Sequence, residues 1–204
     1  MNLNQIFKHL TPFEHWEFND CLDNDSLYEI SYSKIPDGER AYDGTRAADH
    51  TGEGLDGKLR LFITKENNLH FPYLTKVINF LQEKLSVEKI SKILNKDLSS
   101  SYVRLEIIGD KKGFWLKPHK DISEKLMTMM IWANPYQESE SLGTDLYDNN
   151  LNKVKTIQYK HNSGYFFSSG QDTWHGLEQK EIKKERRCIQ INYVSFVTDW
   201  PVNK

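Results

Sequence analysis

The chain has 204 residues, of which 38% are hydrophobic, and a formal net charge of −2 at pH 7. This length suits one well-filled core, and the interspersed charges offer no basic surface to nucleic acid or to an anionic membrane. Cys21 and Cys188 are the only cysteines, which excludes a disulfide framework and a Cys-x-x-Cys zinc site. We expect a single cytoplasmic domain over residues 1–204, with no secretory leader and no membrane span.

Residues 1–98 are predicted to form the elements that support a second, β-rich half. Alternating apolar and polar residues indicate strands over residues 27–33 and 59–64. Over residues 71–94 apolar side chains recur at helical spacing, and this pattern predicts two amphipathic helices separated by a break near Ser86. Helices of this kind pack their apolar stripe against the outside of a sheet.

A glycine-studded segment from Pro36 to Gly57 lies between the two predicted strands. Connections of this length inside a compact domain are often functional. We expect the segment to close over the mouth of a site, where it would exclude water and contribute side chains such as Tyr42, Arg46 and His50 to substrate selection.

Residues 99–200 are predicted to be almost entirely β, apart from a turn at Gly109–Gly113. Short runs with strand character follow one another in this half: 102–107, 114–119, 126–133, 142–147, 156–160, 164–168 and 186–194. Short strands at regular spacing, with turn residues between them, are typical of an antiparallel sandwich or barrel. We therefore predict a mainly β fold with flanking helices from the N-terminal half.

His119 and Asp121 stand at the end of one predicted strand, with a single residue between them. Alternate side chains of an extended strand share a face, so both can reach one point, whereas a helix would spread them about 200° apart. Pro118 argues against a helix interior here. A third ligand would then come from another strand, and His175, far along the chain, is the candidate.

The segment Arg186–Val194 alternates strictly between an apolar and a polar face. The apolar face carries Ile189, Ile191 and Tyr193, and the polar face carries Arg186, Cys188, Gln190 and Asn192. A polar face can line a ligand site inside a small barrel. Arg186 is suited to bind a carboxylate because its planar guanidinium donates two parallel hydrogen bonds, whereas Arg187 lies on the apolar face and should point away.

His-x-Asp, a distant His and then a basic residue that opens a strand form an order that resembles the 2-oxoglutarate- and Fe(II)-dependent oxygenases. The resemblance spans roughly residues 102–194, about half of the chain. It implies a double-stranded β-helix (jelly-roll) core over residues 99–200. The layout is similar to prolyl-4-hydroxylase-like members, which favours an amino-acid, peptidyl or small-metabolite substrate.

The resemblance also implies the roles of individual residues. Fe(II) would be held by the metal ligands and catalytic residues His119, Asp121 and His175. The distal carboxylate of 2-oxoglutarate would lie on Arg186, and two further co-substrate contacts are suggested at Cys188 and Tyr102. The expected reaction consumes O2 and 2-oxoglutarate, releases succinate and CO2, and hydroxylates a C–H bond.

Two alternative functions remain open from the sequence. A cupin-like metal-binding protein uses a similar barrel and metal trio without 2-oxoglutarate chemistry, but it has no need of a carboxylate clamp at Arg186. A metal-dependent isomerase or dioxygenase without 2-oxoglutarate needs an additional His ligand, for which His161 is the candidate. The remaining histidines lack ligand spacing and are predicted to be surface or loop residues: His9, His15, His50 and His70.

Overall fold

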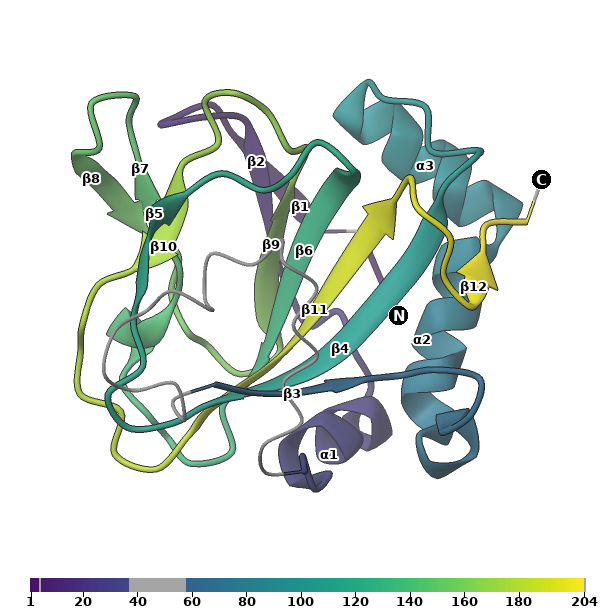
Figure 1. The fold of residues 1–204 in the computed structure, drawn as a ribbon, viewed down its shortest axis with the longest axis horizontal. Coiled ribbons are helices and arrows are strands. Elements are labelled where there is room, and N and C mark those ends of the chain that lie inside the picture. The colour runs from purple at the N-terminus through teal and green to yellow at the C-terminus, as the bar shows by residue number, and fades with distance from the viewer. Residues whose placement is uncertain (4, 37–57, 204) are drawn as a thin grey trace.

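The computed structural model describes residues 1–3, 5–36 and 58–203, and two antiparallel sheets face each other in it (Figure 1). The strands are β1 Ile6–His9, β2 His15–Asn19, β3 Lys58–Phe62, β4 Tyr102–Asp110, β5 Leu116–His119, β6 Lys125–Ala133, β7 Asp145–Tyr147, β8 Lys153–Thr156, β9 Ser163–Phe167, β10 His175–Leu177, β11 Arg186–Val194 and β12 Trp200–Pro201. The helices are α1 Asn24–Tyr32, α2 Pro72–Gln82 and α3 Lys84–Leu94, with 3-10 turns η3 Asn68–His70 and η4 Glu140–Leu142.

The larger sheet has eight strands in the order β1-β2-β9-β6-β11-β4-β12, with β3 also paired to β4. The smaller sheet has four strands in the order β5-β10-β7-β8. Strands from both sides of residue 98 therefore join one sheet. The mainly β, jelly-roll-like arrangement agrees with the predicted fold class. Among the described helices, none combines the length and apolar character needed to cross a bilayer.

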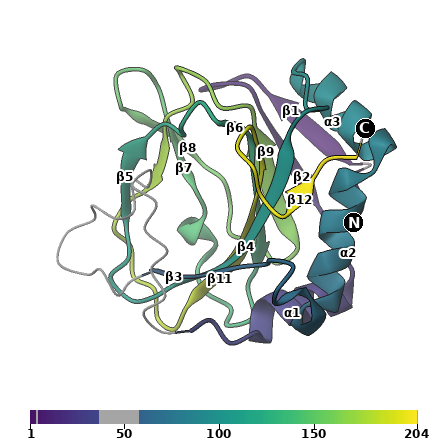
Figure 2. The ribbon, with the colours of Figure 1, turned by 45° about the vertical axis from the view of Figure 1, so that its right-hand side comes forward.

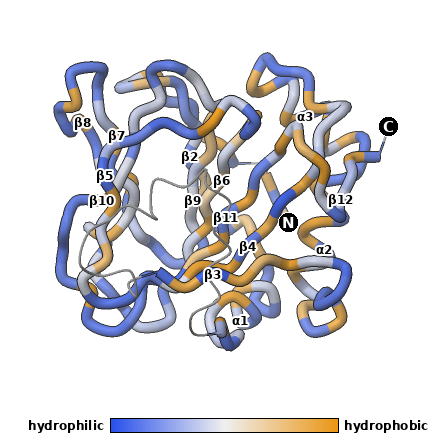
Figure 3. The backbone as a smooth tube through the Cα atoms, viewed as in Figure 1, coloured by the Kyte–Doolittle hydropathy of each residue, from blue (hydrophilic) through white to orange (hydrophobic). Residues whose placement is uncertain are grey.

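Strand alternation divides the interior of the protein into two apolar clusters. The odd-numbered residues of β11, such as Ile189 and Ile191, pack with α1, α2 and α3 on the outer face of the larger sheet. Cys188, together with Met130 and Trp132 of β6, packs between the two sheets. Figure 2 shows the helices along one flank, with the smaller sheet on the other side. Figure 3 shows the hydrophobic colour along the larger sheet and its helices, while most loops are hydrophilic.

The predicted strand over residues 27–33 is wrong, because these residues belong to α1. Asp23 caps the helix by accepting a hydrogen bond from the Ser26 amide at 2.7 Å. Leu27 and Ile30 are buried at helical spacing, while Tyr28 is exposed. In so short a segment, the sequence patterns of a strand and of an amphipathic helix look alike. Packing of these residues against α2 and β11 favours the helix.

Other boundaries differ from the prediction as well. The strand predicted over residues 142–147 begins only at Asp145, and the strand predicted over residues 156–160 is β8, which ends at Thr156. The break between the helices lies at Glu83, not at Ser86, which is a buried residue of α3. The predicted turn at Gly109–Gly113 begins later, because β4 continues to Asp110. Asp110 is paired on both sides, to β3 and to β11, and this pairing extends the strand. The predicted lid falls on residues 37–57, which lie outside the described residues, so it stays a prediction.

Candidate active site

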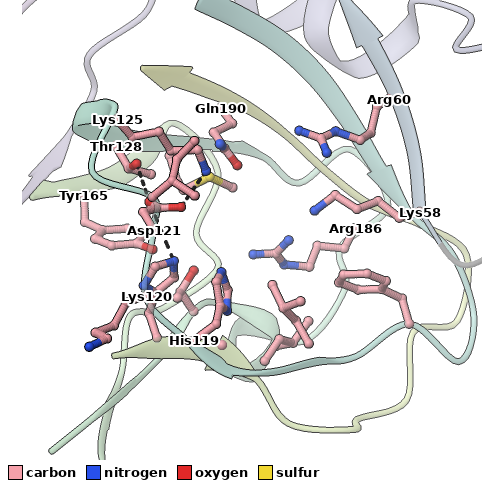
Figure 4. Close-up of a pocket in the computed structure, with 18 of the residues that line it drawn as sticks. Lys58, Arg60, His119, Lys120, Asp121, Lys125, Thr128, Tyr165, Arg186 and Gln190 are labelled. Atoms are coloured by element: carbon pink, nitrogen blue, oxygen red, sulfur yellow. Dashed lines mark hydrogen bonds and ion pairs between the residues drawn. The ribbon is translucent and has the colours of Figure 1, made fainter. Parts of the chain in front are cut away.

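A cavity opens between the two sheets, and its lining includes every residue of the predicted metal site (Figure 4). His119 ends β5 and His175 begins β10, and the two are direct partners in the antiparallel pairing of these strands. Their ring centroids lie 4.3 Å apart. Asp121 follows β5, and its Oδ2 lies 4.0 Å from Nε2 of His175. Ligand atoms of all three side chains lie within 4.8 Å of one another, so they can share one metal ion.

Backbone hydrogen bonds orient both imidazoles toward this common point. His119 Nδ1–H donates to the carbonyl of Lys117 at 3.0 Å, and His175 Nδ1–H donates to the carbonyl of Thr173 at 2.9 Å. A neutral imidazole that donates from Nδ1 keeps its lone pair on Nε2. Hydrogen bonds of this kind fix the tautomer and ring orientation of metal-binding histidines.

The carboxylate of Asp121 is held from the larger sheet. Lys125 Nζ donates to Oδ1 at 2.5 Å, and the Thr128 hydroxyl donates to Oδ2 at 2.5 Å. The side chain of Asp121 is only 3% exposed. Burial disfavours the charged carboxylate, but Lys125 and His175 outweigh burial and hold the pKa of Asp121 well below its usual range. Asp121 is therefore an anionic ligand at neutral pH.

Both histidines of the triad are neutral at physiological pH. Burial, reinforced by the neighbouring His175, lowers the pKa of His119 to about 3. Burial also lowers the pKa of His175, although Asp121 opposes the shift. Neutral imidazoles and an ionised carboxylate are the forms that bind a metal, so the cluster needs no deprotonation before it can bind one.

Arg186 lies across the cavity from the triad, at the start of β11 (Figure 4). Its Nη1 donates to Oδ2 of Asp110 at 2.5 Å, and its Nε donates to the carbonyl of Leu142 at 2.5 Å. Its guanidinium also lies 5.6 Å from the centroid of the Tyr159 ring. These contacts fix the plane of the guanidinium, so its direction is set before any ligand binds.

Lys58 of β3 brings a second cation to the same wall. Its Nζ lies 3.8 Å from Oδ1 of Asp110, whose other oxygen binds Arg186. Two positive charges on Lys58 and Arg186 against one negative charge on Asp110 leave +1 for this group of three. Burial lowers the pKa of Lys58, while Asp110 opposes the shift. An incoming carboxylate would therefore meet a net positive wall.

The faces predicted for β11 agree with the contacts of its first two residues. Arg186 lines the cavity, whereas Arg187 lies on the opposite face, where its Nη1 donates to the carbonyl of Ser33 at 3.0 Å. Arg187 also pairs with Glu185 on that face. The alternation of side chains along the strand was enough to predict that the two arginines lie on opposite faces of β11.

The other two predicted co-substrate contacts do not line the cavity. Cys188 is fully buried beneath Arg186, with its Sγ 4.0 Å from Nη1 of Arg186, and burial raises the pKa of its thiol to about 12. Tyr102 lies at the end of β4 opposite to Asp110 and pairs with Val194. Cys188 is thus a packing residue under the Arg186 guanidinium, and neither Cys188 nor Tyr102 is among the residues that line the cavity.

Residues of this site that were missed in the sequence include Lys58, Asp110, Lys125 and Thr128. Asp110 was assigned to a turn, although it pairs directly with Arg186 once β4 and β11 are aligned. Lys125 and Thr128 begin the strand that faces the triad. Their spacing of four and seven residues from Asp121 does not by itself indicate a contact. The tight connection between β5 and β6 brings both side chains to the carboxylate of Asp121.

One prediction about the other histidines is wrong. His15 is not a surface or loop residue, because it is fully buried in β2. His161 is exposed and accepts a hydrogen bond from the Asn134 amide at 3.3 Å, away from the triad. His50 lies outside the described residues.

No protein-family model matches this sequence, and no curated protein matches it. Solved structures do match across most of the chain. A prolyl-4-hydroxylase from Pseudomonas putida is 11% identical, with a TM-score of 0.58 over 90% of this chain and 93% of that chain. A prolyl hydroxylase from Trichoplax adhaerens, in complex with a peptide fragment of hypoxia inducible factor, is 16% identical, with a TM-score of 0.58 over 89% of this chain and 83% of that chain.

A third match is an oxidoreductase of the 2OG-Fe(II) oxygenase family from Burkholderia pseudomallei. It is 11% identical, with a TM-score of 0.56 over 86% of this chain and 81% of that chain. The structural neighbours are thus prolyl-4-hydroxylases and 2OG-Fe(II) oxygenases, and at these identities the likeness is one of fold. The predicted double-stranded β-helix architecture is confirmed.

Proposed function

We propose that this chain is an Fe(II)- and 2-oxoglutarate-dependent oxygenase that hydroxylates a C–H bond of an amino-acid, peptidyl or small-metabolite substrate. The observation that carries the proposal is the presence of two opposed groups in one cavity. His119, Asp121 and His175 offer two nitrogens and one oxygen to a metal, and Arg186 offers a fixed guanidinium to a carboxylate.

The donor set fits Fe(II). Two imidazoles and one carboxylate on one side of an ion leave open positions on the other side, as non-haem Fe(II) oxygenases require. His119 and His175 come from adjacent strands of the smaller sheet, while Asp121 is fixed by two side chains of the larger sheet. The ion would therefore lie at the junction of the sheets, facing the cavity.

The opposite wall fits the far carboxylate of 2-oxoglutarate. Arg186 and Lys58 would bind this carboxylate together, and Asp110 would keep the guanidinium in place. Fe(II), 2-oxoglutarate and O2 supply the oxidation, with succinate and CO2 as products and a hydroxyl group placed on the substrate. The protein binds and orients both molecules, and the surrounding apolar cluster excludes bulk water.

A peptidyl or amino-acid substrate is supported by one of the structural neighbours. The Trichoplax adhaerens prolyl hydroxylase is in complex with a peptide fragment. The cupin-like alternative, which lacks 2-oxoglutarate chemistry, gives no role to the buried Arg186 and the partly buried Lys58 in the cavity. We therefore favour the oxygenase.

A substrate screen tests the proposal. Wild-type protein with Fe(II), 2-oxoglutarate and O2 is incubated with amino acids, peptides and small metabolites, and succinate is measured against a no-substrate blank. At least one compound should raise succinate release and gain one oxygen atom by mass, and His119→Ala should abolish both signals. Succinate release that His119→Ala leaves unchanged would contradict the proposed site.

Replacing Lys58 by methionine should weaken 2-oxoglutarate binding about fivefold. The reason is the loss of one partly screened charge contact, worth about 1 kcal/mol. Calorimetric titration of the Mn(II)-loaded protein, in which no turnover occurs, measures the effect. Lys112→Met, which removes an exposed lysine elsewhere, is the matched control. Equal affinities in the two variants would remove Lys58 from the clamp.

Replacing Thr128 by valine should weaken metal binding about 10- to 100-fold, as loss of a hydrogen bond to a metal ligand typically does. The hydroxyl of Thr128 would no longer hold Oδ2 of Asp121. Thr128→Ser keeps the hydroxyl and should restore binding. Thr198→Val, which removes a hydroxyl bonded to the Val103 carbonyl, controls for general loss of stability. Metal affinity that is the same in the valine and serine variants would contradict this role.

A further inference from the structure

A second cluster of potential metal ligands lies on the hairpin of β1 and β2. His9 ends β1, and His15 and Glu17 belong to β2. Nε2 of His9 lies 3.2 Å from Oε1 of Glu17, and Nε2 of His15 lies 3.6 Å from the same oxygen. Ligand atoms around a four-coordinate zinc ion are about 3.3 Å apart, given bonds of 2.0–2.2 Å. Nε2 of His15 and Oε1 of Glu17 are thus close to the spacing of a ligand set, and all three residues offer ligand atoms within 4.8 Å of one another.

The hairpin cluster repeats the arrangement of the first site. His15 and Glu17 have the same His-x-carboxylate spacing on one strand as His119 and Asp121. His9 is the direct partner of His15 in the antiparallel pairing, as His175 is of His119. In each site a strand supplies a histidine, a carboxylate follows two residues later, and the neighbouring strand supplies a histidine opposite the first.

His15 has the same tautomer as the two histidines of the first site. Its Nδ1–H donates to the carbonyl of Phe13, two residues before it, at 2.8 Å. His119 and His175 donate to the residue two before them in the same way. The imidazole of His15 is fully buried, so this hydrogen bond fixes its orientation and leaves the Nε2 lone pair facing Glu17.

A lysine occupies the point on which these ligands converge. Nζ of Lys155, from β8, lies 3.4 Å from Nδ1 of His9 and 3.4 Å from Nε2 of His15, and it also binds Glu17. Nε2 of His9 faces Glu17, so Nδ1 is the His9 nitrogen that faces this point. An ammonium group has three N–H donors, so it matches the three lone pairs that converge here. Figure 1 shows the connection between β1 and β2 extending toward β7 and β8.

Lys155 can leave this position, because its side chain is 29% exposed and ends a flexible four-carbon stem. Its departure would leave two imidazole nitrogens and one carboxylate oxygen facing the vacated position.

We propose that His9, His15 and Glu17 form a second binding site for a divalent transition-metal ion such as Zn(II), and that the ammonium of Lys155 occupies this site when the metal is absent. Two imidazoles and one carboxylate are a ligand set that zinc accepts, with a fourth position left for water. None of the three residues lines the cavity of the first site, so the two sites can be measured separately.

Metal stoichiometry is the first test. Wild-type protein equilibrated with Co(II) should bind two ions per chain, and His9→Ala should bind one. His9 is the ligand of choice for substitution, because its side chain is 38% exposed and the variant should keep its fold. In a His119→Ala/His175→Ala background, which lacks the first site, one Co(II) should remain and should be lost on adding His9→Ala.

Competition by Lys155 is the second test. Lys155→Met removes the ammonium, and Co(II) should then bind to the hairpin site about tenfold more tightly, as loss of one repelling charge a few ångströms from a divalent ion predicts. Lys153→Met is the matched control, because it removes the same charge from the same strand at a lysine that pairs with Glu178 instead. It should leave the affinity unchanged.

The result that overturns the proposal is equally definite. If the background variant, shown to be folded by circular dichroism, binds no Co(II) with or without Lys155→Met, the hairpin is not a metal site. The same conclusion follows if a second ion binds to the wild type and His9→Ala does not remove it. Lys155 would then be a permanent structural cation that links β8 to the β1–β2 hairpin.

Discussion

His119→Ala and His175→Ala are each expected to weaken Fe(II) binding at the first site more than about 100-fold, since loss of only an outer hydrogen-bond partner costs roughly 10- to 100-fold. Each variant removes one of the two imidazoles that face each other across β5 and β10. Anaerobic titration with Fe(II), with metal retained after desalting as the readout, measures the effect.

His70→Ala is the matched control for these two variants, because His70 is an exposed histidine in η3. Metal bound at the hairpin site is removed from the measurement by placing all variants in a His9→Ala background. The triad assignment would fail if both variants retained one tightly bound Fe(II) in that background. A comparison of thermal unfolding without metal separates loss of a ligand from loss of fold, which matters most for the buried His175.

Arg186→Ala should weaken 2-oxoglutarate binding about tenfold or more. Truncation of one partner of a buried charge pair costs roughly 2–5 kcal/mol, and 1.4 kcal/mol is already a factor of ten. Without Arg186, Asp110 would also face the incoming carboxylate with only Lys58 to compensate it. Calorimetric titration of Mn(II)-loaded protein with 2-oxoglutarate gives the affinity.

Arg187→Ala is a close control for this variant. Arg187 is the next residue of the same strand, is also buried, and forms an ion pair with Glu185, but it lies on the opposite face. Its loss should destabilise the protein without changing 2-oxoglutarate affinity. A larger loss of affinity in Arg187→Ala than in Arg186→Ala would overturn the assignment of faces on β11.

The fold was predictable where a periodic pattern was long enough to be unambiguous. Residues 188–193 of β11 alternate in polarity, and in the structure Ile189, Ile191 and Tyr193 pack with the helices while Cys188 packs between the sheets. The segment 27–33 was too short for that distinction. Its stronger signal was Asp23, a residue type that favours the start of a helix, followed by Asp25 in the first turn.

Only those site residues could be predicted whose relation depends on spacing within one segment of the chain. The spacing of His119 and Asp121 has a direct geometric meaning, whereas Asp110 and Lys58 reach Arg186 through pairing between distant strands. His15 and Glu17 carried the same spacing signal as the first pair and were nevertheless missed. Their partner His9 lies across a hairpin, and the register of that hairpin was not readable from the sequence.

The most direct test of the proposed function is the dependence of 2-oxoglutarate binding on the metal in the first site. In His9→Ala protein, calorimetry with 2-oxoglutarate is performed with and without Mn(II). One molecule of 2-oxoglutarate should bind per chain when the metal is present, and binding should be about tenfold weaker or absent without it, because the metal supplies a coordinating contact beyond Arg186. Equal affinity in the two titrations, or no binding in either, would contradict a shared site for Fe(II) and 2-oxoglutarate.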